Sequence, residues 1–461
     1  MNPTNLSDTI VALSTPAGTG AIGVIRLSGA EAIAICDRVF WGKKLANADS
    51  HTLHFGTIKD GERILDEVVV GLFKGPTSYT KEDVVEVSCH GSQYIIQELI
   101  QLFIREGARL AMPGEFTMRA FLNGRMDLSQ AEAVADLIAS SSESAHTIAM
   151  QQMRGGVSDE IKKLRQELLD FASLIELELD FGEEDVEFAD RTKLKELVAK
   201  IQGLLKVLLD SFALGNAIKQ GINTVIAGRP NAGKSTLLNI LLNEERAIVS
   251  DIAGTTRDTI EETLNIKGVN FRLIDTAGLR EAQDQIEAVG VEKALAKIKQ
   301  SAVLIYVFDI IKTQPEEVAA DLANLKQDNL HILAVANKMD LNPYTKAEHY
   351  TSEFLSEDQF IPVSAINNMN VEYLKERLYE VAIGQGLTEE SAIVSSARHY
   401  EALRKAQASL ADVLKGLTDN IPSDFVAMDI RRALAFLGEI TGEISTDDLL
   451  GNIFGRFCIG K

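Results

Sequence analysis

The sequence has few cysteines and no long apolar run, and each absence excludes a class of protein. Cys36, Cys89 and Cys458 are widely separated, so neither a disulfide framework nor a zinc-ligand spacing is available. The longest apolar run, Ala302 to Phe308, is far too short to span a bilayer, and residues 1–8 contain no basic segment followed by an apolar core. We therefore expect a cytoplasmic protein with no membrane segment.

Proline and basic residues are also scarce. Only 9 of the 461 residues are proline and there is no low-complexity tract, so the chain is expected to form about three folded domains. The net charge of -21 repels polyanions, which excludes tight binding of nucleic acid by a general basic surface. Any role on nucleic acid must be local or shared with a partner.

The pattern of apolar residues changes twice along the chain. Short β-branched runs before residue 122 alternate with turns and with two helical patterns, Ala30 to Phe40 and Gln93 to Glu106, which is typical of an α+β domain. The strands expected there are Thr9 to Ser14, Ile22 to Ser28, Thr52 to Lys59, Leu65 to Phe73 and Val84 to Cys89. Long amphipathic helices follow from Leu128, and helices resume from Glu389 after a stretch of α/β alternation.

These changes predict a multidomain protein of the α/β plus all-α class. We expect an N-terminal α+β domain over 1–122 and a discontinuous helical domain over 123–217 and 383–461. A Ras-like P-loop domain is expected to be inserted between the two helical segments, over 218–382. A change of state in such an insert could move the helices.

The inserted domain begins with a phosphate-binding signature. Gly228 to Ser235 reads G-x-x-x-x-G-K-S between an apolar strand, Asn223 to Ala227, and a helix expected to start near Thr236. The glycines allow backbone N–H groups to wrap the phosphates, and Lys234 can reach the β and γ oxygens. The Ser235 hydroxyl can bind Mg²⁺.

Three later motifs each follow an apolar strand. Asp275 follows Val269 to Ile274 and can hold the water shell of Mg²⁺, while the N–H of Gly278 can reach the γ-phosphate. Asn337 to Asp340 follows Ile332 to Ala336, and the Asp340 carboxylate can accept hydrogen bonds from N1 and N2 of guanine, which favours GTP over ATP.

The fourth motif closes the set. Ile361 to Ala365 is expected to be a strand whose loop, at Ser364 and Ala365, donates to guanine O6. All four motifs in this order predict a GTP-binding site at the ends of parallel strands.

The loop from Ser250 to Asp258 is rich in small residues and contains two threonines. A threonine hydroxyl could complete the Mg²⁺ shell only while the γ-phosphate is present, which is the physical basis of a switch. Residue chemistry alone leaves both Thr255 and Thr256 as candidates.

The residue that orients the attacking water is not a glutamine, because Leu279 stands directly after the Asp-x-x-Gly motif. The polar candidates that follow are Arg280, Glu281, Asp284, Gln285 and Glu287. A cation could supply the charge of an absent arginine finger, and the Asn231 side-chain oxygen could bind a monovalent ion.

The whole chain resembles the bacterial and organellar tRNA-modification GTPases called MnmE or TrmE. The matching segments outside the GTP motifs are Asp8 to Ala12, Ile25 to Gly29, Pro76 to Glu86, Cys89 to Gly91, Pro113 to Thr117, Arg119 to Leu128 and Phe457 to Lys461. The resemblance implies that the first domain mediates homodimerisation and binds a 5-formyl- or methylene-tetrahydrofolate through Arg26, Glu86, Arg125 and Lys461. It also implies that Cys458 is a thiol near the one-carbon site, where covalent chemistry is a hypothesis.

For the GTPase centre, the resemblance resolves what chemistry leaves open. It implies potassium at Asn231, Ser250, Ile252 and Thr255, with Mg²⁺ at Ser235 and Thr256. The water-orienting acid falls on Glu287, with Lys234 and Arg280 as the other catalytic candidates. The expected GTP contacts are Asn231, Ala232, Gly233, Lys234, Ser235, Thr236, Ser250, Asp251, Ile252, Ala253, Gly254, Thr255, Thr256, Asp275, Thr276, Ala277, Gly278, Asn337, Lys338, Asp340, Ser364 and Ala365.

The resemblance also implies a function. A homodimer of such a chain would join the FAD-dependent partner MnmG (GidA) in a heterotetramer, share the tRNA with it, and modify C5 of the wobble uridine U34 with a carboxymethylaminomethyl or aminomethyl group. The main alternative is a regulatory GTPase of the ribosome-assembly type, in which nucleotide state controls docking. A membrane-remodelling GTPase would need a basic or apolar membrane face, which the net charge disfavours.

Overall fold

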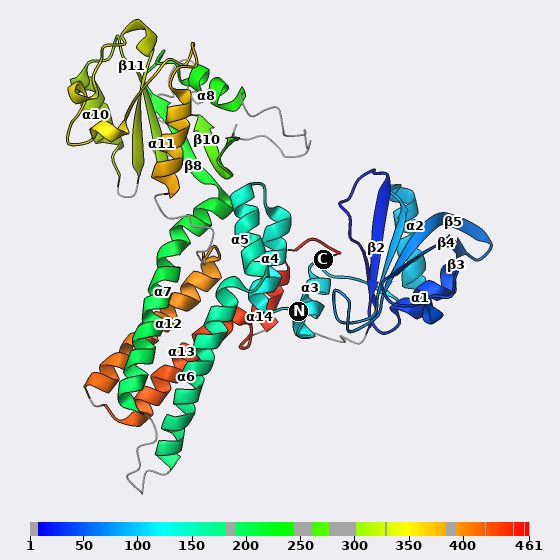
Figure 1. The fold of residues 1–461 in the computed structure, drawn as a ribbon. Coiled ribbons are helices and arrows are strands. Elements are labelled where there is room, and N and C mark those ends of the chain that lie inside the picture. The colour runs from blue at the N-terminus through cyan, green and yellow to red at the C-terminus, as the bar shows by residue number, and fades with distance from the viewer. Residues whose placement is uncertain are drawn as a thin grey trace, which may run out of the picture. The chain divides into compact units, whose positions relative to one another are not determined.

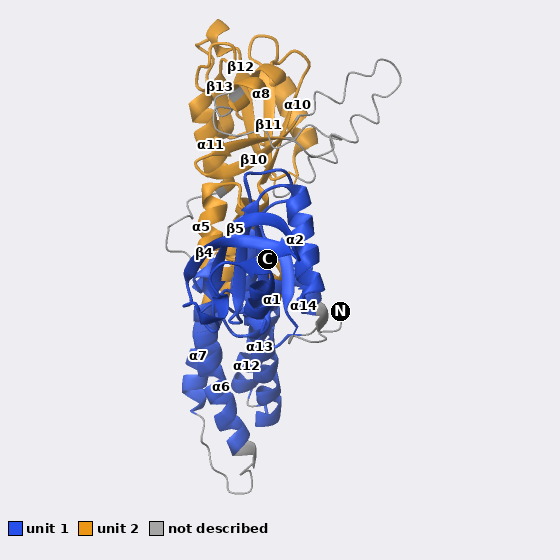
Figure 2. Ribbon diagram, turned by 90° about the vertical axis from the view of Figure 1, so that its right-hand side faces the viewer, with its two compact units in different colours: residues 1–138, 152–202, 402–461 blue, residues 139–151, 203–401 orange. Residues whose placement is uncertain are grey.

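The computed structural model describes residues 8–180, 190–243, 261–275, 301–327, 330–383, 393–419, 421–445, 447–455 and 457–460. Figure 1 shows the helices and strands of the chain, and Figure 2 shows the two compact units into which it divides. Unit 1 comprises residues 1–138, 152–202 and 402–461, and unit 2 comprises residues 139–151 and 203–401. Within the described residues, each unit contains one β-sheet, so the predicted multidomain mixture of sheets and helices is confirmed.

Unit 1 contains a seven-stranded sheet in the order β3-β4-β5-β6-β2-β1-β7. The strands are β1 (Ile10–Leu13), β2 (Ile22–Ser28), β3 (Phe40–Trp41), β4 (Thr52–Asp60), β5 (Arg63–Phe73), β6 (Val84–His90) and β7 (Arg109–Leu110). All neighbours are antiparallel except β1 and β7. The five strands predicted here are therefore present, whereas the two-residue strands β3 and β7 are too short to leave a pattern in the sequence.

Two helices cover one face of this sheet. Alternate residues of β5, such as Val68 and Val70, pack with residues of α1 (Ala32–Val39) and α2 (Gln93–Arg105). The intervening residue Val69 is exposed, as is Phe55, which lies opposite it on β4. Along β4 and β5, the period of two thus separates a face covered by α1 and α2 from an open one.

Further helices of unit 1 come from both ends of the chain. They are α3 (Glu115–Leu122), α4 (Leu128–Ala139), α6 (Gly156–Asp180), α13 (Ser423–Thr441) and α14 (Asp447–Phe454). Helices α6 and α13 pack together, with Arg165 Nε donating to the Leu434 carbonyl and Arg431 paired with Glu176 at 2.7 Å. Segments before and after the insert therefore share one core. The domain boundaries 1–122, 123–217 with 383–461, and 218–382 stay predictions.

Four of the described helices cross the boundary between the units. Helices α4 and α5 (Glu143–Met153) cross it near their C-terminal ends, and α7 (Arg191–Gln220) and α12 (Ala397–Thr418) cross it farther from their ends. The predicted helix start at Glu389 lies outside the described residues. Among the helices of the described ranges, none combines the length and apolar character needed to cross a bilayer.

Unit 2 contains a six-stranded sheet in the order β13-β12-β11-β8-β10-β9. Its strands are β8 (Ile222–Gly228), β9 (Glu261–Ile266), β10 (Val269–Asp275), β11 (Val303–Asp309), β12 (His331–Asn337) and β13 (Phe360–Val363). All neighbours are parallel except β9 and β10. Strand β9 was not predicted, because Leu264 and Ile266 are its only buried apolar residues.

Helices cover both faces of the second sheet, as expected for a parallel sheet. Residues of α8 (Lys234–Asn243) and α11 (Val371–Ile383) belong to one apolar core, and residues of α10 (Pro315–Leu325) to the other. Helix α5 (Glu143–Met153) begins beside the β9–β10 hairpin, where the Ser144 N–H donates to the Gly268 carbonyl at 3.1 Å. Two expectations need correction: α8 begins at Lys234 and not near Thr236, and β13 ends at Val363, leaving Ser364 and Ala365 in the following loop.

Candidate functional site: a GTP-binding sheet edge and a separate cationic pocket

The phosphate loop leaves β8 at a point where only glycine fits. Gly228 has φ +148°, and a Cβ there would lie 1.9 Å from the Val307 carbonyl oxygen on β11. Gly233 has φ +93°, and a Cβ there would lie 2.2 Å from Asn337 Nδ2. Both glycines of the G-x-x-x-x-G-K-S motif are therefore required by backbone conformation and by close contact.

Asn337 joins three of the predicted motifs. Its side chain is buried, Nδ2 donates to the Ala232 carbonyl at 2.8 Å, and Oδ1 accepts from the Ala365 N–H at 3.0 Å. The phosphate loop, the Asn-Lys-x-Asp motif and the Ser-Ala loop are thus held together by one amide. A buried amide that satisfies two backbone groups fixes the distance between the segments that carry them.

Asp340 provides an acceptor for the base. Its Oδ1 atom is buried and has no hydrogen-bond partner among the described residues. A buried carboxylate oxygen without a partner is costly, unless a ligand supplies a donor. The residue type and its position after Asn337 fit the N1 and N2 donors of guanine, so the described residues fit a guanine nucleotide.

Lys234 begins α8 and lies within the loop. Its Nζ donates to the carbonyls of Gly228 at 3.0 Å and Arg229 at 2.9 Å, both in the phosphate loop. Ser235 and Thr236 follow on the first turn of α8 and are exposed. The N-terminus of this helix and the lysine together form the kind of site that binds phosphate.

Part of the predicted centre lies outside the described residues. This applies to the loop Ser250 to Thr256, to Thr276, Ala277 and Gly278, and to the catalytic candidates Arg280 and Glu287. Asp275 ends β10, directly beside Ile226 on β8, which is the strand-end position that the motif predicts. The Mg²⁺ and potassium ligand sets therefore stay predictions, with Ser235 and Asn231 as their described members.

Sequence analysis missed two charged groups beside the loop. Arg229 pairs with Asp321 at 2.8 Å and with Glu317 on α10, and the Tyr306 hydroxyl donates to the same Asp321 carboxylate. Burial would raise the pKa of Asp321, but hydrogen bonds from Arg229 and Tyr306 outweigh it and lower that pKa. No local sequence pattern points to Arg229, since its partners lie about ninety residues later.

The second missed group is Asp309, the last residue of β11. Its carboxylate is 2.6 Å from Lys338 Nζ in the Asn-Lys-x-Asp motif. The sequence does contain a signal for Asp309 as a site residue, because it ends an apolar strand just as Asp275 and Asn337 do.

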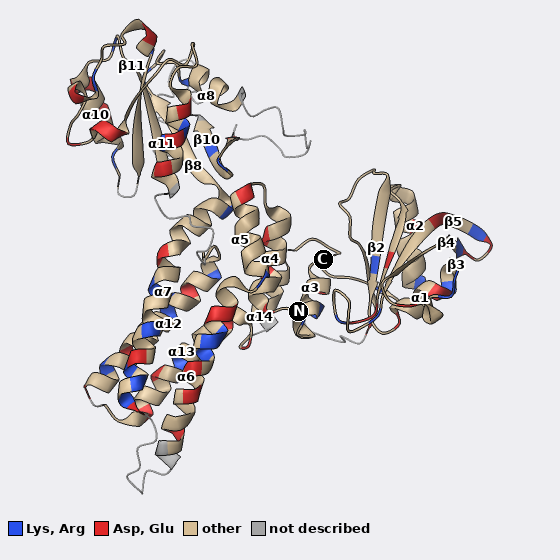
Figure 3. Cartoon of the chain, viewed as in Figure 1, with Lys and Arg blue, Asp and Glu red and all other residues tan. Residues whose placement is uncertain are grey.

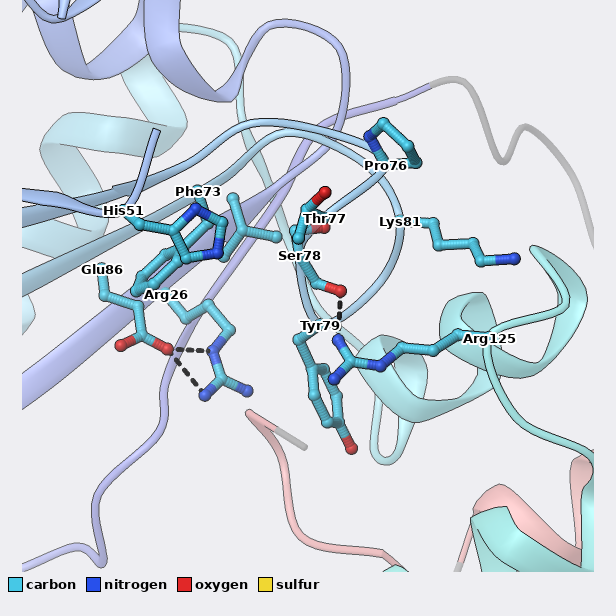
Figure 4. Close-up of a pocket in the computed structure, with 11 residues that line it drawn as sticks. Arg26, His51, Phe73, Pro76, Thr77, Ser78, Tyr79, Lys81, Glu86 and Arg125 are labelled. Atoms are coloured by element: carbon cyan, nitrogen blue, oxygen red, sulfur yellow. Dashed lines mark hydrogen bonds and ion pairs between the residues drawn. The ribbon is translucent and has the colours of Figure 1, made fainter. Parts of the chain in front are cut away.

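A separate pocket lies in unit 1, with a volume of about 490 Å³. It is lined by Arg26, His51, Phe73, Pro76, Thr77, Ser78, Tyr79, Lys81, Val84, Glu86 and Arg125 (Figure 4). The predicted folate residues Arg26, Glu86 and Arg125 are all in its wall. Lys461 lies outside the described residues, and Cys458 is exposed and is not among the lining residues.

The pocket is cationic and aromatic. Arg26 and Glu86 are paired in register across β2 and β6, and their side chains form an ion pair at 2.8 Å. The guanidinium carbons of Arg26 and Arg125 lie 5.1 and 5.3 Å from the centre of the Tyr79 ring, and Arg125 donates to the Ser78 carbonyl. Both guanidinium groups therefore lie within cation–π distance of the Tyr79 ring, which stabilises each of them.

The end of the chain lies against the same domain. The Ser14 hydroxyl donates to the Gly460 carbonyl at 3.2 Å, and the Gly114 N–H donates to the Cys458 carbonyl at 3.3 Å. A Cβ on Gly460 would lie 2.0 Å from the Leu13 carbonyl oxygen, so this contact needs glycine. Cys36 and Cys89 are buried free thiols, and burial raises the pKa of Cys89 to about 11.

The sheet order, the glycine-rich loop and the unsatisfied Asp340 oxygen define a P-loop GTPase. The comparisons with known proteins agree and are more specific. The profile of the MnmE helical domain matches residues 128–458, and that of the N-terminus of GTP-binding protein TrmE matches residues 9–125. Among solved structures, a GTP-binding protein from Sulfolobus solfataricus in complex with GDP has 20% identity and a TM-score of 0.29 over 52% of this chain and 73% of its own.

Curated relatives match from end to end. The tRNA modification GTPase MnmE of Cytophaga hutchinsonii is 57% identical over 99% of this chain and 99% of its own length. The protein of the same name from Flavobacterium psychrophilum is 53% identical over 98% of this chain and 99% of its own. The chain belongs to the tRNA modification GTPase MnmE family, and it is a GTP hydrolase.

Proposed function

We propose that this protein hydrolyses GTP in a potassium-dependent manner and, with the FAD-dependent partner MnmG (GidA), modifies C5 of the wobble uridine U34 of certain tRNAs. The added carboxymethylaminomethyl or aminomethyl group takes its one-carbon unit from a tetrahydrofolate. The relatives are named tRNA modification GTPases, which supports the tRNA substrate. Mass spectrometry of tRNA from a strain that lacks the gene tests the proposal, and unchanged wobble uridines would contradict it.

The observation that carries the proposal is the cationic pocket of unit 1. Strands β2 and β6 and the segment before α4 supply Arg26, Glu86 and Arg125 to one cavity. Guanidinium groups suit the anionic glutamate tail of a folate, and a carboxylate such as Glu86 suits the N–H donors of its pterin ring. When bound, the folate supplies the one-carbon unit. The pocket therefore supports an enzyme over a regulatory switch that carries out no modification.

Binding of 5-formyltetrahydrofolate to the full chain tests the pocket directly. We expect Glu86→Gln to weaken binding, because the charge that pairs with Arg26 is lost and one carboxylate oxygen is replaced by an N–H donor. Glu98→Gln is the matched control, since Glu98 pairs with Arg63 outside the pocket wall. Equal binding by wild type and Glu86→Gln would contradict the folate assignment.

The potassium dependence is proposed from the resemblance and from Asn231. This residue is exposed in the phosphate loop and has φ +60°. A bound potassium ion supplies positive charge beside the phosphates. Hydrolysis in potassium and in sodium, with and without Glu287→Ala, tests the cation and the acid separately. Equal rates in both salts would exclude the cation, and full activity of the variant would exclude Glu287 as the water-orienting acid.

We also propose that the chain forms a homodimer through the open face of the unit 1 sheet. Leu53 is 74% exposed and Phe55 is 69% exposed on β4, and Val69 is exposed opposite Phe55 on β5. Such a patch on a sheet face is typical of a surface that another protein covers. The occupant we propose is a second copy of this chain, which is what the family resemblance implies.

The partner and the tRNA belong to the same proposal. Acidic and basic side chains both occur along α6 and α13 (Figure 3). With a net charge of -21, this chain is poorly suited to bind tRNA alone. We propose that MnmG supplies much of the basic surface in a heterotetramer. Titration of labelled tRNA with each protein and with the mixture tests this division, and tight binding by this chain alone would contradict it.

A further inference from the structure

Asp309 is a buried acid with two well-defined contacts at the carboxyl edge of the unit 2 sheet. Asp309 is the last residue of β11, and its side chain is 7% exposed. Oδ2 accepts from Lys338 Nζ at 2.6 Å, and Oδ1 accepts from the Ile311 N–H at 2.9 Å. The Ile310 N–H, next in the chain, donates to the Asn337 carbonyl at 3.1 Å. Asp309 is therefore fixed both to its own loop and to the guanine-recognition motif.

Lys338, the partner of Asp309, also contacts the phosphate loop. Its backbone is in the left-handed region with φ +69°, and its Nζ also donates to the Asn231 carbonyl at 3.3 Å. Asn337 donates to the next carbonyl, that of Ala232. Two consecutive residues of the guanine motif thus hold two consecutive carbonyls of the phosphate loop.

We propose that Asp309 is a positioning residue for the guanine nucleotide. A lysine side chain is flexible, and its ammonium group is strongly hydrated. The Asp309 carboxylate holds that group in one place, between the end of β11 and the Asn231 carbonyl. The guanine motif and the phosphate loop then keep a fixed separation, so that base and phosphates can bind at the same time without reordering cost.

The test is a double-mutant cycle on binding of N-methylanthraniloyl-GDP to the full chain. Asp309→Asn keeps the shape and removes the charge. We expect it to weaken binding by roughly tenfold, the size of a lost charge-assisted hydrogen bond. In the Lys338→Met background the same substitution is expected to change binding by less than about twofold, because the two residues act as a unit. An equal loss in both backgrounds, or no loss in either, would overturn the proposal.

Two further measurements separate positioning from general stability. Asp358→Asn removes another ion pair of unit 2, with Arg377, and serves as the matched control that leaves nucleotide binding unchanged. In steady-state hydrolysis, Asp309→Asn should raise KM for GTP with kcat changed little, since the contact acts on binding of base and phosphate. If Asp309→Asn does not fold, Asp309→Glu retains the carboxylate and should bind more tightly than Asp309→Ser. The opposite order would overturn the proposal.

Discussion

Arg119 is the centre of a buried ion network, and its removal should destabilise unit 1 strongly. Its side chain is 1% exposed and pairs with Asp8 at 2.6 Å, with Glu115 at 3.0 Å and with Glu82 at 3.3 Å. Glu115 is also buried, and it is joined to Asp8 a second time through Arg109. The network connects the start of β1 with α3.

The expected cost follows from what Arg119→Met leaves behind. Removing one partner of a buried pair costs about 3–5 kcal/mol, since the remaining charge is desolvated and unpaired. Because Arg109 still pairs with both Asp8 and Glu115, we expect the lower end, about 3 kcal/mol. Arg38→Met is the matched control: Arg38 pairs with Glu106 at the surface of the same domain, where a pair contributes about 0–1 kcal/mol.

Urea unfolding is the assay. Trp41, the single tryptophan, lies on β3 of this sheet, so its fluorescence reports on this part of the chain. At equal m-values, the midpoint for Arg119→Met should fall by the amount that corresponds to about 3 kcal/mol, and that for Arg38→Met by much less. A loss below about 1 kcal/mol for Arg119→Met, or equal losses in the two variants, would refute the reasoning.

The network also predicts the sign of the pH dependence. Burial alone would raise the pKa of Glu115, but hydrogen bonds from Arg109, the Met112 N–H and Arg119 outweigh it and lower the pKa. The pKa of Asp8 is lowered in the same way. A lowered folded-state pKa gives stability that is present above the unfolded value of about 4 and is lost as the pH falls through the folded value. Wild type should therefore lose more stability than Arg119→Met between pH 6 and pH 3.

Three further predictions concern binding surfaces. Asn337→Ala should weaken GDP binding by roughly tenfold or more, because the Ala232 carbonyl and the Ala365 N–H both lose their partner. Isothermal titration calorimetry measures the affinity, and an unchanged affinity would argue against the role of the Asn337 amide in holding the two loops. Asp340→Asn should weaken GTP binding by roughly tenfold or more and raise the relative affinity for xanthosine triphosphate, since a buried acceptor is replaced by a donor. Competition between the two nucleotides measures this, and a retained preference for GTP would contradict the role of Asp340 in recognising guanine. Phe55→Glu should convert the proposed dimer to a monomer in light scattering, whereas Ile104→Glu, on the helix-covered side, should not.

The GTP site could be predicted because its chemistry is local in sequence. Gly228, Asn337 and Asp275 each stand at the end of an apolar strand, and the parallel order of β10, β8, β11 and β12 brings those ends to one edge. The strands themselves were predictable for the same reason. Asp309 stands at the same kind of strand end, but it belongs to none of the four motifs, so its sequence position alone does not assign it to the site.

The pocket of unit 1 could not be derived from sequence patterns. Arg26 meets Glu86 only because β2 pairs with β6 in one particular register, sixty residues apart in the chain. Tyr79 and Arg125 come from two further segments. Without the family resemblance these residues are ordinary surface charges and an aromatic, since no spacing rule relates residues on different strands.

Helix α3 links the ion network to the pocket, and this decides how substitutions there should be interpreted. Its first residue, Glu115, and Arg119 belong to the network, whereas Phe116 lies 5.7 Å from the Arg26 guanidinium and Thr117 bonds the Tyr79 hydroxyl at 2.9 Å. A variant such as Arg119→Met should therefore reduce the proposed folate binding indirectly, by loosening α3. Tyr79→Phe removes only the hydroxyl and keeps the ring near both guanidinium groups. If folate binding depends on the pocket and not on the stability of α3, Tyr79→Leu should weaken it far more than Tyr79→Phe at equal stability.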